Sequence, residues 1–449
     1  MLPWSADLAG RIDEHVITSE LLRGNPLGDP HERPLLVYVP PGYDDAAGRR
    51  YPSVYVIQGY TGHVAMWANR SPYRQPFPET ADAVFARGEA PPAIVVYVDA
   101  WTAYGGSQFV DSPGTGRYHS YLCNEVVPWV DQHYRTHDAA AHRAIMGKSS
   151  GGFGAMITPM LRPDLFGALA THAGDSLYEY SYIPEFAKCA RHLREYGGDI
   201  WRWWEDFRSR VPFTKPEDHE LIMLLGVSAC FSARDDGSVD LPIDSETGSI
   251  RPDVWQRWLD WDPIRMAPKY ADALRSLRAA WIDAGTRDEW FLDLGAQAFR
   301  AQLRDVGVPD ELIHFELFDA GHMGIDYRYP LSLAWLCQRI AADARLLRAG
   351  DVPLFRSDSL NPVAVSYVEG SWEQTANGNG ETLCASADGR LPGSERLSSC
   401  WPGAGAPRPR PARPTALARR FRCPPARRPT GPGARGRPGR PAVRPAARP

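Results

Sequence analysis

From about residue 34 the chain alternates short apolar, β-rich runs with longer amphipathic stretches, which restricts its possible folds more than any other feature. This alternation is typical of a mostly parallel sheet covered by helices. Near-continuous apolar runs such as AIVVYVD indicate strands that are buried on both faces. We expect strands at residues 35–40, 53–58, 93–99, 143–147, 167–172, 279–285 and 314–319, and helices at residues 119–136, 151–161, 292–307 and 331–350.

One long segment interrupts this rhythm. Residues 175–265 are rich in aromatic side chains, as in DIWRWWEDF and VWQRWLDWDP. A long insertion at this point is typical of a helical cap over the carboxyl ends of the strands, where open sheets bind their ligands. The aromatic side chains either line a pocket or seal the core of the cap, and we expect some of each.

The chain divides into segments of different composition. We expect an N-terminal extension (1–33), an α/β domain with its cap (34–350), a C-terminal extension (351–371) and a tail (372–449). The last 49 residues contain 13 Arg and 13 Pro but no Asp, Glu or Lys. Too few apolar side chains remain to offset chain entropy, so we expect the tail to be disordered.

The basic tail raises the question of nucleic-acid binding, because arginine contacts phosphate. It has only Trp401 and Phe421 to stack on bases and no recognisable binding module, so we do not expect nucleic-acid binding.

The sequence has no run of about 18 apolar residues and no secretory signal, which predicts a soluble, cytoplasmic protein without membrane contact. Its seven cysteines are scattered without CxxC spacing, which argues against a disulfide framework or a zinc site. The sequence indicates no oligomeric state.

The stretch MGKSSGGFG follows an expected strand and begins an expected helix. A GxSxG sequence in this context is typical of a nucleophilic serine on a sharp, strained turn. Side chains two residues before and after that serine would collide, so both positions need glycine. Ser149 meets the condition through Gly147 and Gly151, whereas Ser150 has Lys148 two residues before it. We therefore predict Ser149 as the nucleophile and the Ser150 N–H as a donor to a developing oxyanion.

A serine hydroxyl needs a base to accept its proton, and an imidazole has a suitable pKa. We predict His322 as this base because it follows the expected strand HFELFD and precedes the last expected helix. Other histidines fit less well. His314 begins a strand. The i, i+4 spacing of His133 and His137 on a helix could suggest a metal site, but this spacing more often marks a solvated helix face.

The imidazole in turn needs a carboxylate to fix its tautomer and stabilise its charge. With the chain order Ser, Asp, His, this acid should follow the expected strand AAWIDAG. Asp288 has that position, and Glu289 is the neighbouring alternative. Asp283 should lie inside the strand and Asp293 at the start of the next helix, so neither is favoured.

A second oxyanion donor should come from the loop after an early strand, and YVIQGYTG supplies one. Gly59 permits a tight turn after Gln58, and the backbone N–H of Tyr60 is the predicted donor. A backbone donor leaves no side-chain signature, so the Tyr60 ring is either functional or simply packed.

With these residues in place, the chain resembles the α/β-hydrolase fold and, within it, the putative esterase family. That family includes esterase D (S-formylglutathione hydrolase), enterochelin esterases and mycolyltransferases. The resemblance covers residues 34–345 and rests on QGYTG, GGSQFVDSPGTGRYHSYLCNEVVPWVDQHYRT, GKSSGG, GTRDE and DAGH. It implies a mostly parallel central sheet flanked by helices, and the same roles for Ser149, His322, Asp288 and the two backbone amides.

The expected function is hydrolysis of a small carboxylic ester by a serine nucleophile through an acyl-enzyme, with no metal or organic cofactor. An acyltransferase with the same machinery is one alternative, and a non-catalytic binding protein of this fold is another. Gln58 replaces the serine or histidine of many relatives, and Lys148 replaces a histidine. These departures and the long cap leave the acyl and alcohol specificity open.

Overall fold

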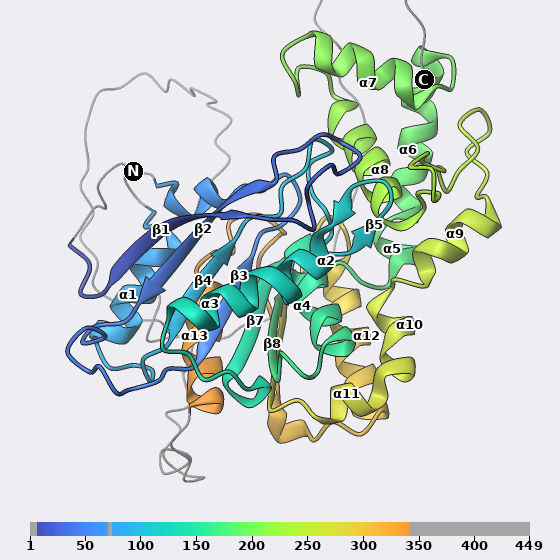
Figure 1. Ribbon diagram of the computed structural model, residues 1–449. Helices are drawn as coiled ribbons and strands as arrows, with labels where there is room; N and C mark the ends of the chain where they lie inside the picture. Colours follow the sequence, from blue (N-terminus) through green and yellow to red (C-terminus); the bar gives the residue numbers. More distant parts are fainter. Residues whose placement is uncertain (1–6, 71–73, 342–449) are drawn as a thin grey trace, which may run out of the picture. The chain divides into compact units, whose positions relative to one another are not determined.

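The computed structural model describes residues 7–70 and 74–341, and Figure 1 shows them arranged around one large sheet. In this part of the chain eight strands form the sheet, in the order β1-β2-β4-β3-β7-β8-β9-β10. β2 pairs antiparallel with β1 and β4, and all other neighbours are parallel. The strands are β1 Arg11–Thr18, β2 Glu32–Val39, β3 Ser53–Ile57, β4 Ile94–Val98, β7 Arg143–Lys148, β8 Ala168–His172, β9 Ala279–Gly285 and β10 Ile313–Phe318.

Helices follow most of the strands, and a short ribbon of β5 Asp111–Ser112 and β6 Gly116–Arg117 lies outside the main sheet. The helices outside the cap are α1 Phe77–Ala86, α2 Tyr118–Ser120, α3 Val127–His133, α4 Ser150–Leu161, α11 Ala271–Arg275, α12 Leu292–Asp305 and α13 Arg328–Ile340. A mostly parallel sheet with helices in the connections is the predicted α/β-hydrolase architecture, and that prediction is confirmed.

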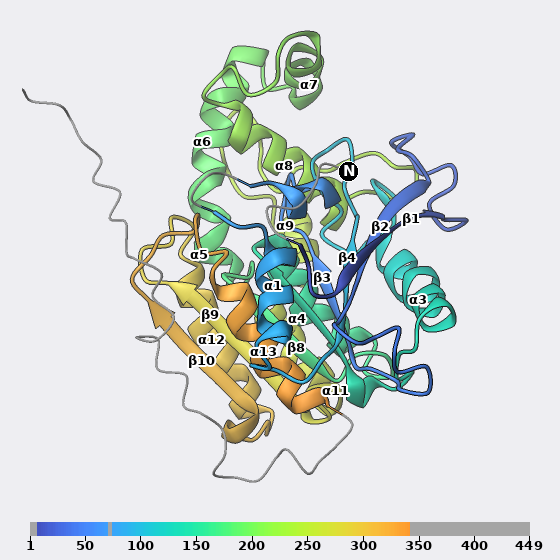
Figure 2. The same ribbon diagram turned by 90° about the vertical axis from the view of Figure 1, so that its left-hand side faces the viewer.

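The core has two parts, one on each face of the sheet. Tyr55 and Ile57 of β3 pack among side chains of α3, α4 and α12, whereas Val54 and Val56 pack among those of α1 and α13. Figure 2 shows α1 and α13 next to each other on one face, and Figure 1 shows α3 and α4 on the other. All residues of β3, β4 and β8 are buried, as expected for strands covered on both sides.

The sheet begins earlier in the chain than residue 34. β1 lies inside the expected N-terminal extension and pairs with β2 over its whole length. Its sequence RIDEHVIT mixes charged and apolar residues, because an edge strand keeps one face in solvent: Val16 is 66% exposed and Ile17 is 5% exposed.

The helix expected at residues 119–136 is shorter and irregular. It contains α2, a π-helical turn at Tyr121–Val126 and α3, which ends at His133. The backbone N–H of Tyr51 donates to Arg135 O, and the His137 N–H donates to Tyr51 O, so this part of the chain is extended. The expectation that His133 and His137 share a helix face is therefore wrong.

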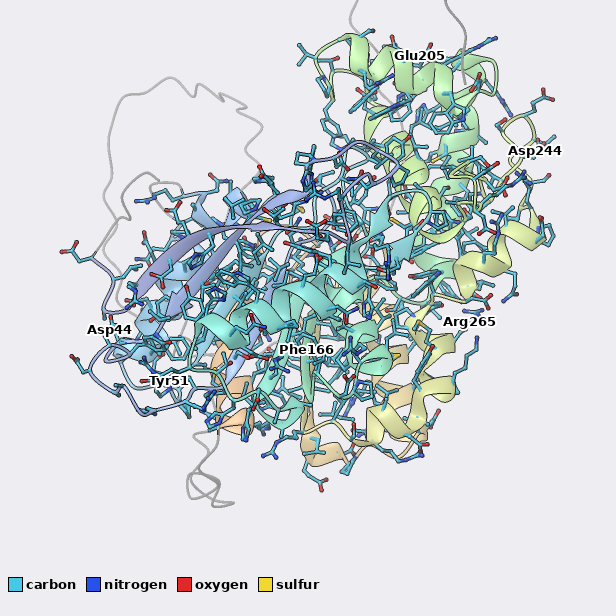
Figure 3. The ribbon with its side chains drawn as sticks, viewed as in Figure 1. Asp44, Tyr51, Phe166, Glu205, Asp244 and Arg265 are labelled. Atoms are coloured by element: carbon cyan, nitrogen blue, oxygen red, sulfur yellow. The ribbon has the colours of Figure 1, made fainter. Side chains whose placement is uncertain are left out.

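Between β8 and β9 the chain forms the helical cap that the aromatic segment predicted. Its helices are α5 Tyr178–Ser181, α6 Ile183–Leu193, α7 Ile200–Ser209, α8 Asp218–Phe231, α9 Pro252–Leu259 and α10 Pro263–Met266. Trp203 and Trp258 are fully buried, so these large rings seal the core of the cap. Arg265 on α10, which is labelled in Figure 3, pairs with Asp262 and with Glu179 on α5. These ion pairs connect the start and end of the cap.

The expected segments 351–371 and 372–449, and the last residues of the helix expected at 331–350, lie outside the described residues. Across residues 7–70 and 74–341, no helix combines the length and apolar character needed to cross a membrane.

Candidate active site

The chain turns sharply at Ser149, between the end of β7 and the start of α4. Ser149 has φ 59° and ψ −126°, a backbone conformation that is strained for a residue with a side chain. A Cβ atom on Gly147 would lie 2.5 Å from the Gly151 carbonyl group, and one on Gly151 would lie 2.5 Å from Ile57 O. Larger residues cannot replace either glycine without moving the backbone, so the turn depends on both.

His322 and Asp288 meet at the carboxyl ends of β9 and β10. Asp288 Oδ2 lies 2.8 Å from His322 Nδ1, and the two residues are 5% and 4% exposed. The other carboxylate oxygen of Asp288 accepts the backbone N–H of Trp290 at 2.9 Å. A carboxylate at Nδ1 keeps the ring proton there, which leaves Nε2 as a proton acceptor.

Glu289, the alternative acid, does not contact the imidazole ring. Its Oε2 accepts the backbone N–H of His322 at 2.8 Å. The Trp290 ring lies edge-on to the imidazole, with 4.8 Å between ring centroids. Asp288 therefore contacts the ring, while Glu289 and Trp290 restrict the position of the loop that carries it.

Asp175 is the residue next to the serine that the sequence reasoning missed. Its Oδ1 lies 3.5 Å from Ser149 Oγ, and its Oδ2 accepts Ser150 Oγ at 3.2 Å and the Tyr182 hydroxyl at 3.1 Å. Burial raises the pKa of Asp175. Among the hydrogen bonds of residues 7–70 and 74–341, none joins Ser149 to His322, so the hydroxyl faces Asp175 instead.

A sequence signal for Asp175 did exist. It follows β8, the parallel neighbour of β7, and acids just beyond the carboxyl end of such a strand lie at the same edge as the Ser149 turn. Asp288 likewise follows a strand end, but it was predicted from the chain order Ser, Asp, His.

The loop after β3 lies against the turn. A Cβ atom on Gly59 would be 3.0 Å from Lys148 O and 3.5 Å from Ser149 Cβ. Within the described chain, the backbone N–H groups of Tyr60 and Ser150 have no hydrogen-bond acceptor. Two unused donors beside the serine are what an oxyanion site needs.

The side chain of Tyr60 is packed between the sheet domain and the cap. Its hydroxyl lies 2.5 Å from Tyr104 O and 2.6 Å from Ile222 O on α8, and a Cβ atom on Gly226 would lie 2.2 Å from the hydroxyl oxygen. The ring therefore holds its own backbone N–H in a fixed place relative to α8.

The competing histidines lie elsewhere. His314 stacks on Trp281 with 3.6 Å between ring centroids, and His133 stacks on Trp129 at 4.0 Å. His137 lies beside His142, with 4.8 Å between ring centroids. In the part of the chain that the structure describes, no cluster of three or more His, Cys, Asp or Glu residues could hold a metal ion.

Comparison with known proteins identifies one matching family, described as "Putative esterase", over residues 30–327. A curated relative, an endo-1,4-beta-xylanase/feruloyl esterase from Xylanibacter ruminicola, is 27% identical over 160 residues. That match covers 34% of this chain and only 20% of the relative.

The comparison with solved structures gives matches of low sequence identity, two of which are hydrolases. A ferulic acid esterase is 20% identical with a TM-score of 0.48, and the match covers 75% of this chain and 100% of that one. An S-formylglutathione hydrolase from Agrobacterium tumefaciens is 17% identical with a TM-score of 0.46, covering 76% and 99% of the two chains.

Proposed function

Because the chain belongs to the putative esterase family, we propose that it hydrolyses carboxylic esters of small molecules with Ser149 as the nucleophile, His322 as the base and Asp288 as the acid. We call these three residues the edge triad, since all three follow the carboxyl ends of strands. The observation that carries the proposal is the strained Ser149 turn at the same sheet edge as the buried His322–Asp288 hydrogen bond of 2.8 Å.

In the first half of the reaction, a rotamer change moves Ser149 Oγ from Asp175 towards His322. Oγ attacks the acyl carbonyl carbon while its proton passes to His322 Nε2. The N–H groups of Tyr60 and Ser150 stabilise the negative oxygen of the tetrahedral intermediate, and Asp288 stabilises the imidazolium. The bond to the alcohol oxygen then breaks, that oxygen takes the proton from Nε2, and an acyl-serine ester remains.

In the second half, water replaces the alcohol. His322 Nε2 takes a proton from the water as its oxygen attacks the acyl carbon. The tetrahedral intermediate breaks at the Ser149 Oγ bond, Oγ recovers the proton from Nε2, and the carboxylic acid is released. Ser149 and His322 are then back in their starting states, so the cycle uses one water for each ester.

Covalent labelling tests the proposal directly. A fluorophosphonate should modify the wild-type protein at Ser149, with the site identified by peptide mass spectrometry, and Ser149→Ala should not be labelled. Ser209→Ala is a matched control, because it removes an exposed hydroxyl on α7. Labelling that is lost in Ser150→Ala but kept in Ser149→Ala would contradict the assignment of the nucleophile.

The same acyl-enzyme allows an acyltransferase test. The rate of acid release from an aryl ester is measured with and without added alcohols. A hydrolase releases mainly the free acid, whereas predominant formation of a new ester would replace hydrolysis with acyl transfer as the function.

A further inference from the structure

Lys148 stands apart from the other lysines of the chain. The sequence contains four, and three of them pair with carboxylates at 2.8 to 3.8 Å: Lys188, Lys215 and Lys269. Within the described residues Lys148 forms no ion pair, and its Nζ lies 3.8 Å from the Met323 sulfur. A thioether is a weak acceptor, so the ammonium has no strong hydrogen-bond acceptor in contact with it.

The acids around Lys148 are occupied by other partners. Asp288 and Glu289 accept hydrogen bonds from the ring and backbone of the predicted base, and Asp175 accepts those of Ser150 and Tyr182. Burial lowers the pKa of Lys148 to about 8, and the positive charge of Arg74 acts in the same direction, although these three acids oppose the shift. The ammonium therefore carries its charge at neutral pH with no carboxylate in contact with it, although the charges of these three acids reach it.

The position of the Lys148 ammonium places it near the alcohol part of the substrate ester rather than the acyl part. Lys148 directly precedes Ser149, and Met323 directly follows His322. In the proposed reaction His322 must reach the oxygen of the departing alcohol, so groups beside the histidine loop lie on the alcohol side. Met323 is 71% exposed, so this side of the turn is open to solvent.

From this placement we propose that Lys148 binds a negatively charged group, such as a carboxylate, on the alcohol part of the ester. The proposal rests on the ester hydrolysis proposed above and adds the substrate class. A charge-assisted contact between the ammonium and a substrate carboxylate replaces the thioether contact with a strong acceptor. The preferred substrate is then an acyl ester of an acidic alcohol or phenol.

The experiment compares three esters. 4-Acetoxybenzoate has an anion on the alcohol part, its methyl ester is the neutral match, and monophenyl succinate has the anion on the acyl part. The readout is the kcat/KM of each charged ester divided by that of methyl 4-acetoxybenzoate. We expect Lys148→Met to lower this ratio about tenfold for 4-acetoxybenzoate, and Lys148→Arg to restore most of it.

Lys269→Met is the matched control, because it removes one exposed positive charge far along the chain and should leave the ratio as in the wild type. A ratio for 4-acetoxybenzoate that is the same in Lys148→Met and the wild type, with both esters hydrolysed, overturns the proposal. A loss confined to monophenyl succinate overturns the assignment to the alcohol side. If the wild type hydrolyses none of the esters, the proposed function itself fails, which is a different result.

A second measurement needs no variant. With methyl 4-acetoxybenzoate as substrate, 4-hydroxybenzoate should inhibit the wild type more strongly than methyl 4-hydroxybenzoate below pH 8. This difference should decline as the pH rises through about 8, where Lys148 loses its proton. Equal inhibition by the two compounds at pH 7 counts against the proposal.

Discussion

Inside the sheet domain, Ser332, His172 and Asp283 repeat the residue types of the edge triad. In this buried triad, His172 Nδ1 lies 2.7 Å from Asp283 Oδ1 and Nε2 lies 2.9 Å from Ser332 Oγ. All three residues are 0% exposed. The buried triad has the complete chain of hydrogen bonds, whereas in the edge triad the serine hydroxyl faces Asp175. Under the proposed function, a complete hydrogen-bond chain is therefore not what distinguishes the catalytic triad from the structural one.

The difference lies in the second ring nitrogen. In the buried triad His172 Nε2 lies 2.9 Å from the Ser332 hydroxyl, which also lies 3.1 Å from Tyr329 O. Both nitrogens of His172 therefore have partners inside the protein, and the ring is fully buried, so no substrate can reach it. In the edge triad only Nδ1 is occupied by a carboxylate, which leaves Nε2 of His322 available.

The buried triad instead fixes the backbone next to the proposed nucleophile. Asp283 Oδ2 accepts Trp281 Nε1 at 2.7 Å and Arg328 Nε at 2.9 Å, which joins β9 to α13. The His172 carbonyl accepts the Ser149 backbone N–H at 3.0 Å. One group of residues thus holds the strained turn in place, and the other is proposed to do chemistry on it.

Removing the serine of each triad should give the largest contrast. Ser149→Ala should lower kcat for phenyl acetate by about 10⁵-fold or more, because no other group replaces the nucleophile. Ser332→Ala should keep kcat within about tenfold and mainly lower the melting temperature. Circular dichroism checks that both variants are folded. Equal losses of kcat in the two variants would break the distinction between the triads.

Changing the acid of the edge triad should have the next largest effect. Asp288→Asn should lower kcat by about 10⁴-fold, because the amide no longer fixes the proton on Nδ1 of His322. Glu289→Gln is the matched control: its contact is with the backbone N–H, so its loss of kcat should be far smaller. A larger loss in Glu289→Gln would exchange the roles of the two acids.

Changing the acid of the buried triad should affect folding. Asp283→Ala leaves His172 and Arg328 buried without their carboxylate and should lower the free energy of unfolding by about 3–5 kcal/mol. Asp310→Ala breaks an exposed pair with Arg304, which solvent screens, and should cost far less. Urea unfolding at pH 7 measures both. A loss near 1 kcal/mol for Asp283→Ala would mean that the buried triad contributes little to stability.

The sequence predicted the parts of the molecule whose signals are local. Seven strands of the main sheet, the cap and the glycine pattern around Ser149 each follow from a short stretch of sequence. β1 was missed because an edge strand is half exposed and lacks the apolar run of a central strand. The expected helix face for His133 and His137 failed because a distant residue, Tyr51, pairs with the chain just after α3.

The contacts of single side chains could not be predicted from the sequence, for a different reason. Asp283 was expected inside a strand, as observed, but its partner His172 lies 111 residues earlier and nothing local links the two. Asp175 follows a strand end like Asp288, yet the chain order Ser, Asp, His directed attention to the later strand. Such contacts depend on which strands become neighbours, and strand order is a property of the whole sheet.

The pH dependence of folding gives the smallest and most specific contrast. Burial raises the pKa of Asp175 in the folded protein, so the native state holds its proton at pH values where the unfolded chain has lost it. Its contribution to stability therefore falls as the pH rises from about 4 towards neutrality. Asp175→Asn removes this dependence. The free energy of unfolding of this variant should therefore increase relative to that of the wild type as the pH rises.

Asp283 should behave in the opposite way. Burial alone would raise its pKa, but His172 and Arg328 outweigh that effect and hold the pKa below its ordinary value. Its stabilising contribution is present above about pH 4 and is lost as the pH falls through the lower, folded-state pKa. On acidification, the loss in free energy of unfolding caused by Asp283→Asn should therefore become smaller. The gain in free energy of unfolding caused by Asp175→Asn should become smaller too. Urea unfolding between pH 3 and 7 measures, for each variant, how its difference in free energy of unfolding from the wild type changes with pH. We expect the two differences to change in opposite directions. If they change in the same direction, the charged form of Asp175 is stabilised by its surroundings just as that of Asp283 is.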